Sequence, residues 1–195
     1  MAIIMVVLLG CYDSPPRVSA PSWDPAGLAN AVIEQFDKND DRVLESAEWQ
    51  NAPGIAAGVS LIDSDGDQRL TEEEISKRFD TYRRLAIGRT SPRFRFLFNG
   101  RPLANAKIEF TPETFLADVI KSAKGTTNAE GLVHPQTEGE SFPGMQAGYY
   151  RIQVSAADKP LPEKYTKATP LGVEVSGTND NPSGYQTPTF LLDGK

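Results

Sequence analysis

The sequence predicts a multidomain α+β protein, in which a small helical domain built from a pair of motifs precedes an antiparallel β-sandwich. From residue 24 to residue 87, apolar side chains recur at helical spacing around two acidic segments. From residue 93 to residue 195, they alternate in short runs that Gly, Pro and Asn separate. The pattern changes at residues 88–92, which we interpret as the linker between the two domains.

Residues 1–10 are apolar and uncharged, and they run directly into Cys11, the only cysteine of the chain. A run of this length is too short to span a bilayer and is typical of an export signal. Leu8-Leu9-Gly10-Cys11 resembles a bacterial lipobox, which implies a signal peptide over residues 1–10 and a lipid anchor on Cys11. We therefore expect an exported, membrane-anchored lipoprotein that faces the periplasm or the cell surface. No Lys or Arg precedes the run, so an apolar start with a free or buried cysteine remains the alternative.

Residues 11–23 are rich in Pro and Ser and predict a flexible tether. Asp24 followed by Pro25 signals a helix start, and Thr71 with Glu74 forms a capping box that starts another helix, which we expect to end near residue 87. Two short helices are expected between the acidic segments, on either side of residues 53–54. The apolar residues that support these helices are Leu28, Val32, Ile33, Phe36, Trp49, Ile55, Val59, Ile62, Ile75, Phe79 and Tyr82.

The two acidic segments, residues 37–48 and 63–74, place oxygen side chains at the same offsets. Ca²⁺ binds roughly six to eight oxygens, and an EF-hand loop of about 12 residues supplies them from positions 1, 3 and 5, a carbonyl at 7, position 9 and a bidentate Glu at 12. Both segments fit, and apolar residues at position 8 are expected to join the loops through a short β contact. The predicted calcium ligands are Asp37, Asn39, Asp41, the Val43 carbonyl and Glu48 in the first loop, and Asp63, Asp65, Asp67, the Arg69 carbonyl and Glu74 in the second.

Position 6 departs from the pattern, because the usual Gly is replaced by Arg42 and Gln68. A side chain held in the left-handed region costs roughly 1 to 2 kcal/mol, or about tenfold in affinity. We therefore expect weak sites, with Kd near the ~10⁻⁴ to 10⁻³ M of extracellular modules. The second loop has four candidate carboxylates, whereas the first has three and carries Arg42, so the second is expected to bind more tightly. The alternative is an acidic helix-loop-helix that has lost its metal.

In the second half, strands are expected near residues 94–98, 106–110, 150–154, 171–175 and 190, with a hairpin over 126–133. Residues 113–123 fit either one helical turn or a loop. Residues 100–106, 127–131, 143–144, 148–150 and 161–165 resemble, in this order, the carboxypeptidase regulatory-like or prealbumin-like domains of planctomycete-type bacterial lipoproteins. The resemblance implies a transthyretin-like sandwich with a structural or binding role.

Several functional classes are disfavoured. A net charge of -6 argues against nucleic acid as a partner. His134 is the only histidine, so neither a zinc site nor a catalytic set is expected, and we predict that the chain is not an enzyme. Tyr149 and Tyr165 are expected in the core rather than on a sugar-binding surface. A set of basic residues is interpreted as a solvated helix face and linker; its members are Lys77, Arg78, Arg83, Arg84, Arg89, Arg93, Arg95 and Arg101.

The leading hypothesis is a calcium-binding, lipid-anchored envelope protein, in which the ion rigidifies a helical module that presents the sandwich to an envelope protein or glycan. The alternative is an accessory carbohydrate- or peptide-binding module of an extracellular enzyme system. A calcium sensor is a third hypothesis, which the short helices disfavour because a sensor needs an apolar groove that opens.

Overall fold

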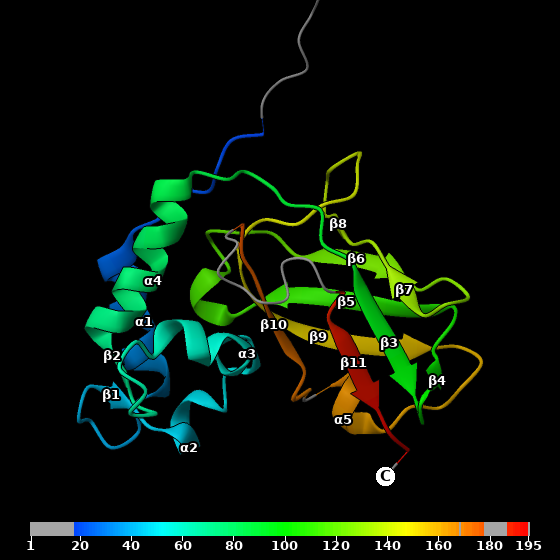
Figure 1. The fold of residues 1–195 in the computed structure, drawn as a ribbon, viewed down its shortest axis with the longest axis horizontal. Coiled ribbons are helices and arrows are strands. Elements are labelled where there is room, and N and C mark those ends of the chain that lie inside the picture. Colours follow the sequence, from blue (N-terminus) through cyan, green and yellow to red (C-terminus); the bar gives the residue numbers. More distant parts are fainter. Residues whose placement is uncertain (1–17, 168, 178–186, 195) are drawn as a thin grey trace, which may run out of the picture.

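The computed structural model describes residues 18–167, 169–177 and 187–194, and these residues form a mixed α+β structure. Figure 1 shows the helices of residues 24–85 gathered on one side, here called the helical unit, and the β-sheets of residues 94–192 on the other, here called the β unit. The expected signal peptide, Cys11 and the start of the tether lie outside the described residues.

The helical unit follows the start and stop signals of the sequence. Asp24 caps helix α1 (Pro25–Phe36) by accepting a 3.2 Å hydrogen bond from the N–H of Gly27. Two short helices follow, α2 (Ser46–Trp49) and α3 (Pro53–Ile62). The capping box at Thr71 and Glu74 is confirmed at the start of α4 (Glu72–Leu85), which packs along α1 and ends slightly before residue 87 at a left-handed Ala86.

The β unit contains two sheets. The larger has the strand order β10-β9-β5-β6-β8, and the smaller has the order β11-β3-β4, with β7 also paired to β3. Short helical segments, η1 (Thr114–Leu116) and α5 (Glu163–Thr166), lie in the connections. The strands are β3 (Phe94–Phe98), β4 (Arg101–Pro102), β5 (Ala106–Pro112), β6 (Ala123–Thr126), β7 (Leu132–Val133), β8 (Gln136–Thr137), β9 (Gly148–Ala156), β10 (Gly172–Val175) and β11 (Thr189–Leu192).

Two details of the strand pairing differ from the expectation. Residues 126–133 do not form a hairpin, because β6 pairs with β5 and β8 while β7 pairs with β3. The turn between them, in which Asn128 accepts hydrogen bonds from two following N–H groups, carries the chain from one sheet to the other. In addition, β11 runs parallel to β3, so the sheets are not wholly antiparallel. A strand that arrives by a long connection is not held to the antiparallel direction that a tight turn imposes.

One core runs through both units. The rings of Phe94 on β3 and Phe110 on β5 lie 5.1 Å apart between the two sheets. Helix α3 packs on β9 and β10, and η1 packs on α1. Trp23, at the end of the expected tether, is buried and stacks on Phe79 of α4 at 6.0 Å. The helical unit and the β unit therefore share buried apolar side chains, and Thr90 between them pairs with Met145 through a β-bridge.

Close contact between α3 and β10 predicts a strong effect of Gly172→Ala. A Cβ at residue 172 would overlap the backbone of Pro53, which cannot rotate away as a side chain can. We expect the variant to lose about 3 kcal/mol of unfolding free energy, measured by urea denaturation. Gly194→Ala is the matched control, because its Cβ would meet only atoms at 3.6 Å or more. Equal stabilities of the two variants would contradict this packing.

Candidate metal centre

The two acidic segments lie side by side at one end of the helical unit (Figure 1). A two-residue strand in the first, β1 (Val43–Leu44), pairs antiparallel with one in the second, β2 (Leu70–Thr71). Leu44 lies directly opposite Leu70, and both side chains are fully buried. The expected β contact through position 8 is therefore confirmed.

In the first loop (residues 37–48), backbone N–H groups hold the acidic side chains. The carboxylate of Asp37 accepts from the N–H of Asp40 at 2.8 Å and of Arg42 at 2.7 Å. Glu48 closes the loop by accepting from the N–H of Lys38 at 2.8 Å and of Glu45 at 3.0 Å. The two ends of the loop are thus fixed by the carboxylates of Asp37 and Glu48, each of which accepts from two backbone N–H groups.

Two further bonds of the first loop hold its middle. The side-chain oxygen of Asn39 accepts from the N–H of Asp41 at 3.0 Å, and Asp41 accepts from the N–H of Val43 at 2.9 Å. Each is an Asx turn, in which a short polar side chain accepts from the backbone two residues on. Loop positions 1, 3, 5 and 12 are therefore all ordered by the backbone.

The second loop (residues 63–74) repeats this pattern at the same offsets. Asp63 accepts from the N–H of Gly66 at 2.8 Å and of Gln68 at 3.0 Å. Glu74 accepts from the N–H of Ser64 at 2.8 Å and of Thr71 at 3.0 Å. Two different sequences therefore fold into the same loop.

The middle of the second loop also matches. Asp65 accepts from the N–H of Asp67 at 3.1 Å, and Asp67 accepts from the N–H of Arg69 at 2.8 Å. Carboxylate oxygens of Asp63, Asp65 and Asp67 come within 4.8 Å of one another, a spacing at which one cation could contact all three. Since hard cations prefer several carboxylate oxygens, this group is the strongest candidate for a metal site among the described residues.

The surroundings of Glu74 favour its ionised form. Burial opposes its ionisation, but the hydrogen bonds from the backbone and hydroxyl groups of Thr71 and Ser64 outweigh burial and lower the pKa of Glu74. A carboxylate that accepts several hydrogen bonds favours its charged form. The side chain at position 12 is thus ionised and oriented.

Position 6 adopts the strained conformation that its place in the loop requires. The φ angles of Arg42 and Gln68 are 62° and 65°, in the left-handed region, where a side chain costs roughly 1 to 2 kcal/mol. Position 4 is also left-handed, at Asp40 with φ 60° and at Gly66 with φ 78°. The side chain of Arg42 leaves the loop and pairs with Glu72 at the start of α4.

The side chain of Arg69 would compete with a metal ion for the first loop, although the sequence predicted only the backbone carbonyl of Arg69 as a ligand, in the second loop. Its guanidinium lies 3.5 Å from the carboxylate of Asp41 and 3.3 Å from that of Glu45. The amide of Asn39 also donates to both carboxylates at 3.3 Å. A metal ion entering the first loop would have to displace these donors.

Position 9 of each loop adds an oxygen-bearing side chain to the predicted ligands. Glu45 stands there in the first loop and Thr71 in the second. Partial desolvation, together with Glu48 and Asp41 nearby, raises the pKa of Glu45, and Arg69 offsets this only in part. Counting nine positions from Asp37 would have identified Glu45 as a further oxygen donor.

The helix that leaves the second loop reaches a buried ion pair. Arg78, one turn beyond Glu74 on α4, contacts Glu174 of β10 through Nε at 2.8 Å and Nη2 at 2.6 Å. The hydroxyl of Tyr82 donates to the same carboxylate. The sequence suggested that Arg78 belongs to a solvated basic face. This prediction is wrong, because only 7% of the residue is exposed. Its partner lies too far along the chain for local patterning to identify.

A second buried carboxylate joins the start of α3 to the β unit. Glu113 accepts from the N–H of Gly54 at 2.7 Å and from Nε of Arg151 at 2.6 Å. Arg151 also donates to the carbonyl of Asn51 at 3.0 Å. Burial raises the pKa of Glu113, and the two donors offset this only in part.

The remaining candidate residues have simpler places. Cys11 lies outside the described residues, and His134 is exposed between β7 and β8. Tyr149 and Tyr165 are buried, at 1% and 4% exposure, so neither presents its ring for stacking on a sugar. In the described parts of the chain, no helix combines the length and apolar character needed to cross a bilayer.

Comparison of the chain with known protein families, with curated proteins and with solved structures finds no match.

The left-handed backbone at Gln68 predicts that Gln68→Gly tightens calcium binding. Glycine removes the steric cost of φ 65°, part of which the greater freedom of the glycine backbone offsets, so we expect a gain of about threefold to tenfold in affinity, measured by calorimetry. Gln68→Ala is the control, since alanine keeps the Cβ and its cost. Equal affinities of the Gly and Ala variants would contradict the strain argument.

Proposed function

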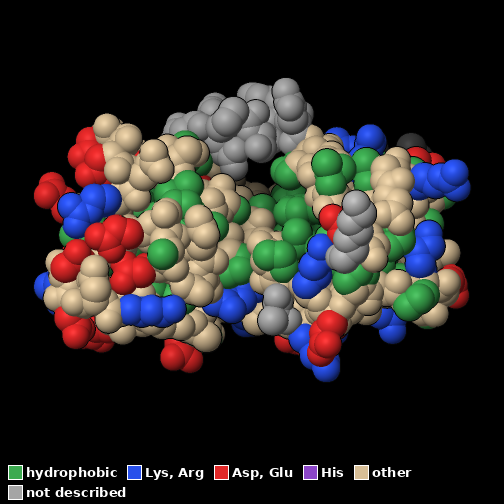
Figure 2. All heavy atoms as spheres, turned by 90° about the horizontal axis from the view of Figure 1, so that it is seen from below, with side chains coloured by type: hydrophobic (Ala, Val, Ile, Leu, Met, Phe, Trp, Pro, Cys, Tyr) green, Lys and Arg blue, Asp and Glu red, His purple; other side chains and the backbone are tan. Residues whose placement is uncertain are grey.

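We propose that the helical unit is an EF-hand pair that binds Ca²⁺ in both acidic loops. The observation that carries this proposal is the duplicated loop geometry. Six hydrogen bonds recur at equivalent positions in the two loops, and in each loop positions 4 and 6 take the left-handed conformation. The acidic side chains gather on the helical side of the molecule (Figure 2).

The second loop is the tighter site in this proposal. Its carboxylates at Asp63, Asp65 and Asp67 converge, whereas in the first loop Arg69 already pairs with Asp41 and Glu45. Backbone N–H groups engage one oxygen each of Asp65 and Asp67, which leaves further lone pairs for a cation. Both oxygens of Asp63 and of Glu74 already accept from the loop, so a cation there would have to share or displace some of these hydrogen bonds. Calcium affinity then follows the number of free carboxylates and the strain at position 6, which places Kd near ~10⁻⁴ to 10⁻³ M.

Sites this weak suit a calcium-rich exterior. We propose that the chain is an exported lipoprotein anchored through Cys11 and that its β unit is a prealbumin-like sandwich with a structural or binding role. The apolar run before Cys11 supports export, and the two packed sheets support the sandwich. In this proposal calcium fixes the helical unit on the sandwich, because α4 carries both Glu74 and Arg78.

Calorimetric titration with calcium tests the function directly. The wild-type chain is expected to release or absorb heat at millimolar calcium, and Glu74→Gln to lose the tighter site because it removes the charge that closes the second loop. Glu48→Gln is the matched control at the same position of the first loop and should leave the tighter site intact. Absence of heat in the wild-type chain would overturn the metal proposal, and loss of the tighter site in Glu48→Gln alone would reverse the order of the loops.

A further inference from the structure

One end of the molecule gathers exposed apolar side chains where the described chain begins. The first described residue, Val18, is 44% exposed, and its backbone contacts Gly88. Leu85, at the end of α4 and shortly before Gly88, is 41% exposed. Phe142, in the connection between β8 and β9, is 71% exposed. Figure 1 shows this connection and the end of α4 on the side where the described chain begins.

Contacts join the segments that contain Val18, Arg89 and Glu140. A hollow of about 370 Å³ is bordered by Val18, Arg89, Lys121 and Glu140, among others. Arg89 pairs at 3.0 Å with Glu140, and Glu140 lies two residues before Phe142 in the chain. We call Val18, Leu85, Phe142, Arg89 and Lys121 the entry face.

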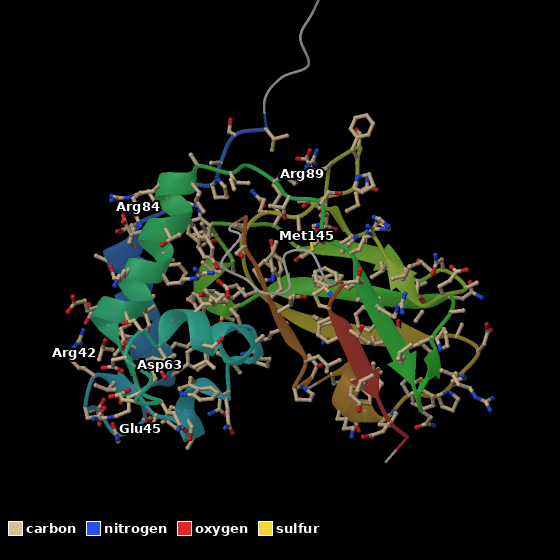
Figure 3. The ribbon with its side chains drawn as sticks, viewed as in Figure 1. Arg42, Glu45, Asp63, Arg84, Arg89 and Met145 are labelled. Carbon is tan, nitrogen blue, oxygen red and sulfur yellow. The ribbon has the colours of Figure 1, made fainter. Side chains whose placement is uncertain are left out.

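Basic side chains border the apolar ones on this end. Arg89 and Lys121 line the hollow, and the exposed Arg83 and Arg84, which both pair with Asp80, occupy the last turn of α4. Figure 3 places Arg84 and Arg89 at this end, while Asp63 and Glu45 of the acidic loops lie at the other. Apolar and aromatic side chains bordered by Arg and Lys are typical of surfaces that rest at the headgroup level of a bilayer.

We propose that the entry face is a lipid-contacting surface, with Phe142 entering the headgroup region. This inference rests on the lipid anchor of the proposed function. Cys11 precedes Val18 by seven residues, and an extended chain of that length spans at most ~24 Å. A lipid on Cys11 therefore holds the entry face close to the bilayer. In this orientation the calcium loops point into the aqueous space.

Depth-sensitive fluorescence tests the proposal. The full chain is coupled through Cys11, its only cysteine, to maleimide-bearing lipid in phosphatidylethanolamine/phosphatidylglycerol vesicles, so that tethering does not depend on cellular lipidation. Phe142→Trp is compared with Leu191→Trp, because both native side chains are 71% exposed and Leu191 lies on β11 outside the entry face. We expect brominated lipid to quench most of the emission that Phe142→Trp adds to the wild-type signal, and little of that added by Leu191→Trp.

Equal quenching of the two added tryptophans, or none at residue 142, would overturn the proposal. A dimer in solution that Phe142→Ser abolishes would assign the entry face to a second copy and would also overturn it. The anchor is examined separately by fractionating cells that produce Cys11→Ser. Release of that variant from membranes supports the anchor, and unchanged fractionation contradicts it whatever the quenching result.

Discussion

The buried ion pair between Arg78 and Glu174 is the interaction on which the relation between the two halves depends. Both side chains are almost fully buried, at 6% and 2% exposure. Breaking such a pair by removing one partner costs about 3 to 5 kcal/mol, because the remaining charge stays buried and unpaired. The pair therefore ties α4 to β10, and Tyr82 donates a further hydrogen bond to the same carboxylate.

The pair also connects the second acidic loop to the β unit. Glu74 closes the second acidic loop and stands one turn before Arg78 on the same helix, so helix α4 connects this loop to the β unit. At the first loop, α2 leads to α3, whose start is tied to the β unit by Glu113. Glycines 54, 58 and 172 permit this approach, since a side chain at any of them would meet atoms of the opposing unit closer than ordinary contact. Calcium binding in the loops would thus stabilise the joint between the units.

Local sequence signals predicted the local structure well. Asp24 and the Thr71/Glu74 capping box act on the backbone within a few residues, and the oxygen offsets of the acidic segments specify the loop backbone in the same way. What remained hidden depends on distant partners. Arg78 lies at helical spacing from Ile75 and Tyr82 on the apolar face of α4, but only Glu174, 96 residues away, explains why a charged side chain is buried there. Likewise, turn chemistry at Asn128 predicted a turn but could not specify which sheet each flanking strand would join.

The central claim is that calcium bound in the acidic loops stabilises the β unit through α4. Hydrogen exchange of the backbone amides of β10, measured with and without calcium, tests it most directly. At calcium about tenfold to a hundredfold above Kd, binding stabilises the folded state by about 1.4 to 2.7 kcal/mol. The amides of β10 should therefore exchange at least about tenfold more slowly with calcium in the wild-type chain, and calcium should slow them less in Glu74→Gln, which keeps only the weaker first site. Calcium-dependent protection confined to residues 37–48 and 63–74 would contradict the account.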